Sequence, residues 1–438
     1  MPNQSTLPSY SRAFTVVTSL FFMWGFITVL VDSLIPRLKE IFELSYFEAG
    51  LVQFAFFIAY GIVSIPAGAL LSRIGYKRGM LVGLATMGVG CFLFWPAASY
   101  RIYGLFLLGY FVLAGGMTVL QVAANPYVSV LGLEKEAASR LNLSQAFNSL
   151  GTAIAPLIGA MFILSDNIKT SVEIATLKES EKLSYFLSEA AAVELPFIVL
   201  AVCLLVLATF VAFAKLPSVL NEKNIGSYGE VLKNNRLLMG AVAIFLYVGA
   251  EVAIGSYLVN YFLDMNLAER IRNSEVLGGL CSALLGKDLN SVNQKGVVGA
   301  FVMFYWMGAM VGRFIGALLT KVFSPGKVLA LFCAGAMAMI FISMFTLGFV
   351  SMGSILLVGL FNSIMFPTIF TLAIEQLGDM KPKGSGILCT AICGGAFIPP
   401  LYGLFTDFAG FKIALSLVII CYAYIMYFGW GTVKYSVR

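Results

Sequence analysis

The sequence predicts an all-α membrane protein whose twelve transmembrane helices form two pseudo-symmetric six-helix halves. Only 11% of the 438 residues are charged and 60% are hydrophobic, whereas about a quarter of the residues in soluble domains are charged. Apolar runs long enough to cross the roughly 30 Å hydrocarbon core recur along the chain. Short motifs of the first half also recur in the second half, which indicates an internal repeat.

Run length, together with Gly, Pro and charge punctuation, predicts twelve spans. Six precede and six follow a polar segment, so we expect an N-terminal half over 1–214, a cytoplasmic linker over 215–236 and a C-terminal half over 237–438. The other hydrophilic stretches are the loops 165–192 and 264–295. The predicted spans cover residues 14–36, 47–71, 79–98, 102–128, 141–164, 193–214, 237–263, 296–319, 328–349, 352–376, 385–404 and 413–432.

The Lys and Arg residues of the loops predict the orientation, because cytoplasmic loops of membrane proteins are enriched in both. If the N-terminus is cytoplasmic, the cytoplasmic segments hold sixteen Lys and Arg residues and the opposite side holds eleven. Both termini are therefore expected in the cytoplasm.

The repeat appears in three pairs of motifs that keep their order. GALLSRIGYKRG begins at Gly68 and GALLTKVFSPGK at Gly316; PLIG begins at Pro156 and PLYG at Pro400; FFMWG and FLYVG form the third pair. Two six-span repeats of this kind describe a large transporter architecture, which places its substrate near the bilayer midplane.

The composition of the chain argues against several classes of function. The basic residues are scattered through short loops rather than gathered in a patch, so nucleic acid is not an expected partner. The chain has no histidine, and the seven cysteines fall almost entirely inside apolar runs, so neither a metal site nor a disulfide framework is predicted. The N-terminus lacks the features of a cleavable signal peptide. Without a nucleophile and base pair, the protein is not expected to be an enzyme.

Two acidic residues lie deep inside predicted spans, Asp32 and Glu251. A charge there costs about 2.5 to 3.5 kcal/mol, and such residues usually face a cavity or a partner. Asp32 precedes Pro36 by four residues, and a proline there frees a backbone carbonyl. Asp32 is interpreted as a protonatable switch, with a local capping role as the alternative. Glu251 is the second acidic residue that this cost marks as a candidate for function.

Amide side chains cluster in the fourth and fifth spans and suit a polyhydroxylated substrate, because an amide both donates and accepts hydrogen bonds. Helix-to-helix hydrogen bonding is the alternative. Trp24 and Tyr247 can stack on the apolar face of a sugar ring, with packing between helices as the alternative for each. The predicted substrate-binding residues are Trp24, Gln121, Asn125, Asn142, Gln145, Asn148, Tyr247, Glu251 and Asn362.

The Gly68 motif resembles the loop between the second and third spans of the major facilitator superfamily, with Ser72 in place of the usual acidic residue. The predicted conformational motif is Gly68, Arg73, Gly75, Lys77 and Arg78. Six further motifs along the chain resemble the sugar:cation symporter family, which includes the bacterial fucose:proton symporter and the glucose/galactose transporters. The motifs are LFFMWGF, VDSLIP, AANPYVSVLG, RLNLSQAFNSLG, FLYVGAEVAIGSYLVNYF and FPTIFTLAIEQLG.

The resemblance implies roles for particular residues. Asp32 matches an aspartate implicated in proton coupling, and Trp24, Gln145 and Asn148 match residues of the sugar cavity. Gln121 stands where the fucose symporter has glutamate, and Glu251 stands where it has glutamine. The glucose/galactose branch typically has glutamate at the position of Glu251. Phe366 also replaces a tyrosine of the fucose symporter. These departures favour glucose, galactose or a related hexose over fucose.

The expected function is therefore hexose uptake by cation symport through alternating access. In this function Asp32 is the cation-linked residue, and Glu251 binds sugar hydroxyls and can share in the cation coupling. The co-transported ion is H⁺ or Na⁺, with a slight preference for the proton, and no cofactor or metal is expected. A symporter of L-fucose or N-acetylglucosamine, a major facilitator exporter and a non-transporting sugar sensor are the alternatives. The partners expected are a monosaccharide, the coupling cation and the lipid bilayer. We expect a monomer in the bacterial inner membrane.

Overall fold

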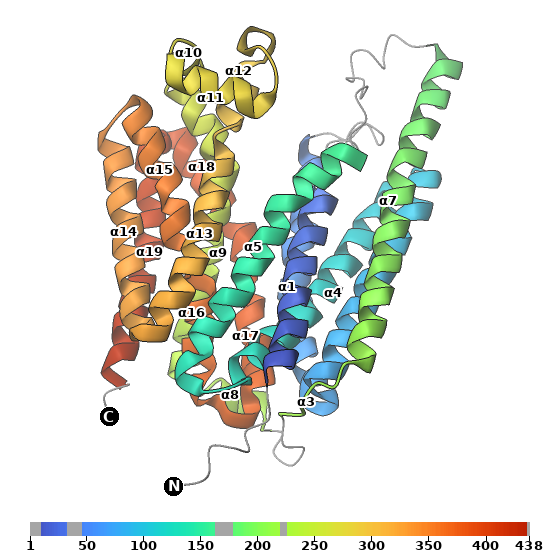
Figure 1. Ribbon diagram of the computed structural model, residues 1–438, viewed down its shortest axis with the longest axis vertical. Helices are drawn as coiled ribbons and strands as arrows, with labels where there is room; N and C mark the ends of the chain where they lie inside the picture. Colours follow the sequence, from blue (N-terminus) through green and yellow to red (C-terminus); the bar gives the residue numbers. More distant parts are fainter. Residues whose placement is uncertain (1–9, 33–45, 163–177, 220–225, 436–438) are drawn as a thin grey trace. The chain divides into compact units, whose positions relative to one another are not determined.

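The protein is described by a computed structural model, which covers residues 10–32, 46–162, 178–219 and 226–435 (Figure 1). These ranges contain helices and no β-strand, so the all-α class is confirmed. The long helices are α1 (Ser11–Asp32), α3 (Tyr46–Ser99), α4 (Tyr103–Val130), α5 (Ala137–Phe162), α7 (Glu179–Phe213), α9 (Asn235–Asp264), α13 (Val302–Val322), α14 (Pro325–Phe345), α15 (Gly348–Asn362), α16 (Met365–Ile374), α17 (Lys381–Thr390), α18 (Gly394–Ala409) and α19 (Phe411–Tyr435).

Nine stretches of the described residues are long and apolar enough to cross a bilayer. The two longest of these stretches each join more than one helix. Leu51–Ser99 has 49 residues and is interrupted at Gly75, whose φ of 80° and ψ of 167° are not helical. Gly348–Ala409 has 62 residues and holds α15 to α18. The membrane-spanning class is therefore confirmed, while the count of twelve spans stays a prediction.

Residues 264–295 differ from the polar loop expected there, because they fold into short helices. These are α10 (Leu267–Arg272), α11 (Glu275–Leu285) and, from its first residues, α12 (Gln294–Gly299). The side chains of Ser274 and Asn293 cap α11 and α12 by accepting hydrogen bonds from backbone N–H groups, which is a strong helix-start signal. Cys281 lies buried in this segment; burial raises the pKa of its thiol, which keeps the thiol protonated.

The chain divides into two compact units. The first unit comprises Met1–Ala137, Phe147–Leu237 and Ile374–Thr390, and the second comprises Ala138–Ala146, Leu238–Ala373 and Ala391–Arg438. Each unit therefore takes one short segment from the opposite half of the sequence. The predicted boundaries at 214 and 236 stay a prediction.

In the first unit, α3 packs along α4 and α7, and α17 packs against both α3 and α4. The segment that precedes α9 contains α8 (Tyr228–Val231) and contacts these helices. The Tyr228 hydroxyl donates to the carbonyl of Ile65 at 2.5 Å, and Lys383 donates to the carbonyl of Gly226. Burial raises the pKa of Tyr228 to about 12, so its hydroxyl keeps its proton throughout the physiological pH range.

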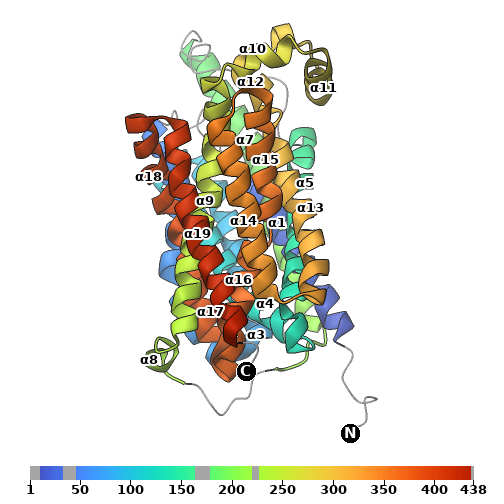
Figure 2. The ribbon, with the colours of Figure 1, turned by 90° about the vertical axis from the view of Figure 1, so that its left-hand side faces the viewer.

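In the second unit, α14 packs between α15 and α19, and α13 packs against α15 (Figure 2). Glycines let α13 and α15 approach closely. Gly308, Gly312 and Gly316 recur every fourth residue on α13, and a Cβ on Gly312 would collide with the carbonyl oxygen of Leu360 and the side chain of Ser363. Small residues at this spacing are the usual device for bringing membrane helices together.

Gly359→Ala is expected to destabilise the protein by about 1–3 kcal/mol, because overpacking a filled helix contact forces backbone shifts. A Cβ at this position would collide with the carbonyl of Tyr305 on α13. The apparent Tm of the purified protein in detergent checks this. Gly353→Ala on the same helix is the matched control, because a Cβ there meets no atom within 4 Å. Equal Tm values for the two variants would contradict the close packing of α13 and α15.

Candidate functional site

In the first unit, two predicted substrate-binding amides lie at the junction of α3, α4 and α17. Gln121 donates to the hydroxyl of Tyr60 at 2.6 Å. Asn125, one turn further along α4, is fully buried, and neither its Oδ1 nor its Nδ2 has a hydrogen-bond partner among the described residues. The buried hydroxyl of Ser64 likewise has none there. Unpaired buried groups are costly, and these donors and acceptors are the kind that a water or a sugar hydroxyl requires.

A proline explains a neighbouring contact of this junction. Pro126 has no N–H, so the carbonyl of Val122, four residues earlier, loses its helical donor. The hydroxyl of Ser385 on α17 donates to that carbonyl at 2.9 Å. Proline in the sequence thus creates the acceptor, and the packing of α17 supplies the donor.

Trp24 and Asn148 lie together where α1 meets α5 in the same unit. The Asn148 amide donates to the carbonyl of Phe21 at 2.9 Å, and the Trp24 ring packs against the Phe21 ring at a tilt of 34°, with centroids 4.7 Å apart. Both predicted residues are more than nine-tenths buried. α1 ends at Asp32, and the side chain of Asp32 lies outside the described residues.

In the second unit, Glu251 and Tyr247 share one face of α9 because they are four residues apart. Glu251 Oε1 and the Tyr247 hydroxyl oxygen are both buried without a hydrogen-bond partner in the part of the chain that is described. A buried carboxylate is strongly destabilising unless a partner or counter-charge compensates it. Arg313 on α13 supplies a positive charge that acts on both side chains.

Arg313 is held at a break in the membrane-crossing segment of α15 and α16. Pro367 leaves the carbonyl of Ser363 without its helical donor, and Arg313 Nε donates to this carbonyl at 3.3 Å. Arg313 Nη1 also donates to the carbonyl of Gln145 on α5 at 3.3 Å. Ser363 caps the C-terminal end of α15, where a positive charge is favoured by the helix dipole.

Asn362 forms a network with two tyrosines. With its amide oxygen toward them, it accepts from the hydroxyls of Tyr305 at 2.7 Å and Tyr422 at 3.1 Å, while its nitrogen donates to the carbonyls of Gly359 and Val358. This orientation satisfies every polar atom of the amide. In this arrangement Asn362 orients two tyrosines, and its predicted role as a direct sugar ligand stays a prediction.

Asn142 and Gln145 also belong to the second unit, in its segment Ala138–Ala146. The Asn142 nitrogen donates to the carbonyl of Ala138 at 2.9 Å and to the hydroxyl of Thr368 at 3.2 Å. Its oxygen is buried without a partner among the described residues. The amides predicted to cluster in the fifth span are thus divided between the two units, because Asn148 belongs to the first unit.

The residues of the predicted conformational motif have separate tasks within the first unit. A Cβ on Gly68 would lie 2.8 Å from both the carbonyl oxygen of Pro382 and the hydroxyl of Tyr228. Gly75 supplies the left-handed turn. Lys77 donates to the carbonyls of Ala212 and Ala214 at the end of α7, each at 2.8 Å. The two arginines, Arg73 and Arg78, are exposed.

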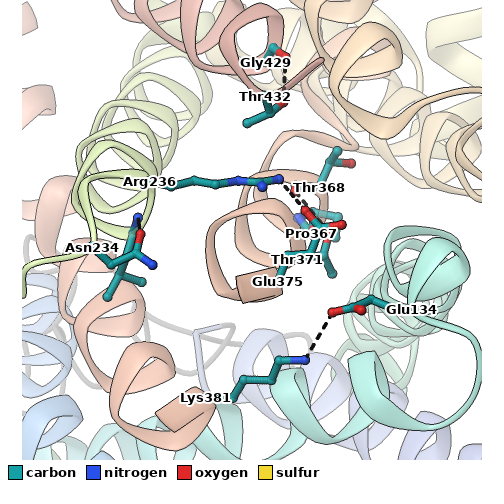
Figure 3. A network of polar contacts seen from close by, with 11 residues as sticks. Glu134, Asn234, Arg236, Pro367, Thr368, Thr371, Glu375, Lys381, Gly429 and Thr432 are labelled. Carbon is teal, nitrogen blue, oxygen red and sulfur yellow. Dashed lines mark hydrogen bonds and ion pairs between the residues drawn. The ribbon is translucent and has the colours of Figure 1, made fainter. Parts of the chain in front are cut away.

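Two ion pairs hold helix ends of the first unit (Figure 3). Arg236 Nη2 lies 2.5 Å from Glu375 Oε2, and Lys381 Nζ lies 3.7 Å from Glu134 Oε1. The side chains of Glu375 and Glu134 are 41% and 61% exposed, so each pair contributes about 0–1 kcal/mol. These pairs set the contacts of helix ends and are not candidates for substrate binding.

Reasoning from the sequence missed four residues of these clusters. Tyr60, Tyr305 and Tyr422 carry no distinguishing signal among the 19 tyrosines. Arg313 does carry one, because it is the one Lys or Arg that lies inside a predicted span rather than in a loop. The described residues contain no group of three His, Cys, Asp or Glu side chains that could hold a metal ion.

Comparison with known proteins gives consistent results. The model of the Major Facilitator Superfamily matches residues 13–400. The chain is 47% identical over 431 residues to the glucose/galactose transporter of Brucella abortus, covering 97% of this chain and 95% of the relative. It is 35% identical over 430 residues to the L-fucose-proton symporter of Escherichia coli, covering 96% and 93%.

The crystal structure of the superfamily transporter FucP in the outward conformation matches with a TM-score of 0.85 at 32% identity, covering 97% of this chain and 99% of that one. The helical fold, the match to the family model and these full-length relatives agree. The chain therefore belongs to the Major Facilitator Superfamily and, within it, to the group of sugar:cation symporters that its glucose/galactose and fucose relatives represent.

Proposed function

We propose that the protein takes up a hexose of the glucose or galactose type together with a monovalent cation, by alternating access. The observation that carries the proposal is the pair Glu251 and Tyr247, whose buried oxygens lack partners among the described residues. Hydrogen bonds to charged groups are roughly twice as strong as neutral ones. One carboxylate beside one phenol can therefore anchor two neighbouring hydroxyls of a sugar.

The name of the Brucella abortus relative supports a hexose, and Glu251 supports the same branch because the fucose symporter has glutamine there. Amides elsewhere in the molecule suit further hydroxyls, namely Gln121, Asn125, Asn142, Gln145 and Asn148. Asp32 is proposed to bind and release the cation. The coupling ion is H⁺ or Na⁺; the name of the fucose relative favours H⁺, and a carboxylate with amide oxygens suits either ion.

We also propose that the protein lies in the bacterial inner membrane, with both termini in the cytoplasm, and acts as a monomer. The apolar exposed faces of the spans support a lipid environment. They include Leu318, Val322 and Phe345, each at least 70% exposed. The excess of Lys and Arg in the segments assigned to the cytoplasm supports the orientation.

The deciding experiment measures uptake of labelled glucose, galactose, fucose and N-acetylglucosamine into proteoliposomes under separately imposed H⁺ and Na⁺ gradients. One cation moving down a potential of 100 mV supports an accumulation of about 50-fold, because 2.3 kcal/mol is available and 1.4 kcal/mol is a factor of ten. We expect glucose or galactose to accumulate with one of the two gradients. Uptake that ignores both gradients would refute symport, and preference for fucose or N-acetylglucosamine would reassign the substrate.

A further inference from the structure

The short helix α11 carries its larger apolar side chains on the outside of the protein. Residues three and four positions apart share one face of a helix, and one such set on α11 is exposed throughout. We call this set the outward face; it consists of Val276 (78% exposed), Gly279, Leu280 (39%), Ala283 and Leu284 (38%). The outward face therefore contains no polar or charged side chain.

The opposite face of α11 holds the helix to its neighbours and is made of small residues. Gly278 is buried, and a Cβ there would lie 3.0 Å from the carbonyl oxygen of Ile271 on α10. The buried Cys281 thiol donates to the carbonyl of Val297 on α12 at 3.5 Å. A helix whose outer side faces water normally turns its apolar stripe toward the core. The reversed arrangement of α11 indicates apolar surroundings on its outer side.

α10 places α11 beside the ends of membrane-crossing helices. The chain leaves α9 at Asp264 and enters α10 at Leu267. At the start of α15, a Cβ on Gly348 would lie 2.8 Å from Nη1 of Arg270 on α10. Both views show α10, α11 and α12 at the end of this unit away from the C-terminal end of α19 (Figures 1 and 2). Only α10 therefore separates α11 from the start of α15, at the edge of the membrane-crossing segments.

Lipid is the partner that fits the outward face at this position. The neighbouring helix ends also expose apolar side chains, namely Phe345, Leu347 and Val350, so acyl chains already have to cover this end of the unit. Charged residues lie just at the two ends of α11, Glu275 before the outward face and Lys287 after it, and both are exposed. An apolar face bounded by groups that can stay in the headgroup layer is typical of helices that lie in the membrane interface.

We propose that α11 is an interfacial helix that lies along the membrane surface at this end of the second unit. Its outward face enters the boundary between lipid headgroups and acyl chains, and its small-residue face holds α10 and α12. The helix thereby anchors the segment 264–295 to the bilayer. This inference goes beyond the proposed function, because it depends on neither the sugar nor the coupling cation.

The test places a fluorophore on the outward face of the full-length protein in lipid nanodiscs. Leu280→Cys is labelled with a maleimide of the environment-sensitive dye NBD, in a Cys203→Ser background because Cys203 is an exposed native cysteine. Peptide mass spectrometry confirms the labelled position. Glu275→Cys is the matched control: it is exposed on the same helix, and five residues of an α-helix turn it about 140° away from residue 280.

Two quenchers report the surroundings of each position: spin-labelled phosphatidylcholine acts inside the bilayer, and iodide acts in water. We expect the lipid to quench at residue 280 at least about threefold more strongly than at residue 275, because an interfacial helix buries its apolar face alone. Iodide should show the reverse order. Equal iodide quenching at the two positions would place the outward face in water and overturn the proposal. Equal lipid quenching would overturn the assignment of this face.

Protection of residue 280 from both quenchers would mean that protein covers it. A second copy of the chain would then be the partner, and the lipid assignment would be wrong. If Leu280→Cys does not fold, as judged by size-exclusion chromatography, Leu284→Cys takes its place, because it lies one turn further along the same face. We expect the same order of quenching for Leu284→Cys, and the opposite order would equally overturn the proposal.

Discussion

Replacing Glu251 with Gln is expected to weaken sugar binding about 10- to 150-fold, because hydrogen bonds to a charged group contribute about 1.5–3 kcal/mol. The amide keeps the shape of the side chain but exchanges one charged acceptor for a neutral acceptor and a donor. The variant also removes a buried charge, so its stability in detergent should be retained. The dissociation constant of the purified protein, measured by isothermal titration calorimetry with glucose and galactose, checks this result.

Glu275→Gln is the control for the first prediction, since Glu275 is an exposed carboxylate at the start of α11. Its sugar affinity should equal that of the natural protein. Unchanged affinity in Glu251→Gln would remove Glu251 from the sugar site. It would also leave no functional explanation for the Glu251 and Tyr247 oxygens, which have no hydrogen-bond partner in the described part of the chain.

Replacing Asp32 with Asn is expected to abolish accumulation of sugar against its gradient while preserving exchange. An amide cannot gain or lose a proton near neutral pH and attracts a cation less strongly than a carboxylate. The energy of the ion gradient is then no longer delivered to the sugar, so the internal and external sugar concentrations should become equal. Proteoliposome uptake under an imposed gradient measures this loss, and counterflow of labelled sugar measures the exchange that remains.

Glu194→Gln is the control for Asp32, because Glu194 lies near a predicted span end and accepts a hydrogen bond from Ser99 at an exposed position. Its accumulation should stay close to that of the natural protein. Intact concentrative uptake in Asp32→Asn would assign coupling elsewhere, and Glu251 would then be the first residue to test.

The helical class and most helix positions follow from the sequence because a bilayer leaves few alternatives. Backbone groups inside lipid must be paired within the segment, so long apolar runs become helices. The breaks in the helices of the tenth and eleventh predicted spans were harder to predict from the sequence. Pro367 signals the first break, whereas the 3-10 turn Ala391–Cys393 between α17 and α18 carries no proline of its own.

Some of the candidate functional residues could also be predicted from the sequence, because the bilayer makes charged residues rare. Asp32 and Glu251 stand out because charge is rare inside apolar runs, and Arg313 could have been found by the same criterion. The partners of these residues could not be found from sequence. Ser385 reaching Val122, or Arg313 reaching Gln145, joins residues more than 160 positions apart, and no local pattern encodes such a distance.

The sequence by itself therefore determined the membrane-spanning helical class and singled out the rare charges inside apolar runs, while the repeat of two six-helix halves stays a prediction. Only the tertiary structure decided which polar groups are already paired. It shows Asn362 bound to Tyr305 and Tyr422, and one oxygen of Glu251 without a hydrogen-bond partner among the residues that the structure describes. The physical reason is that composition and spacing reveal the cost of a buried polar group, whereas its compensation depends on the packing of distant helices.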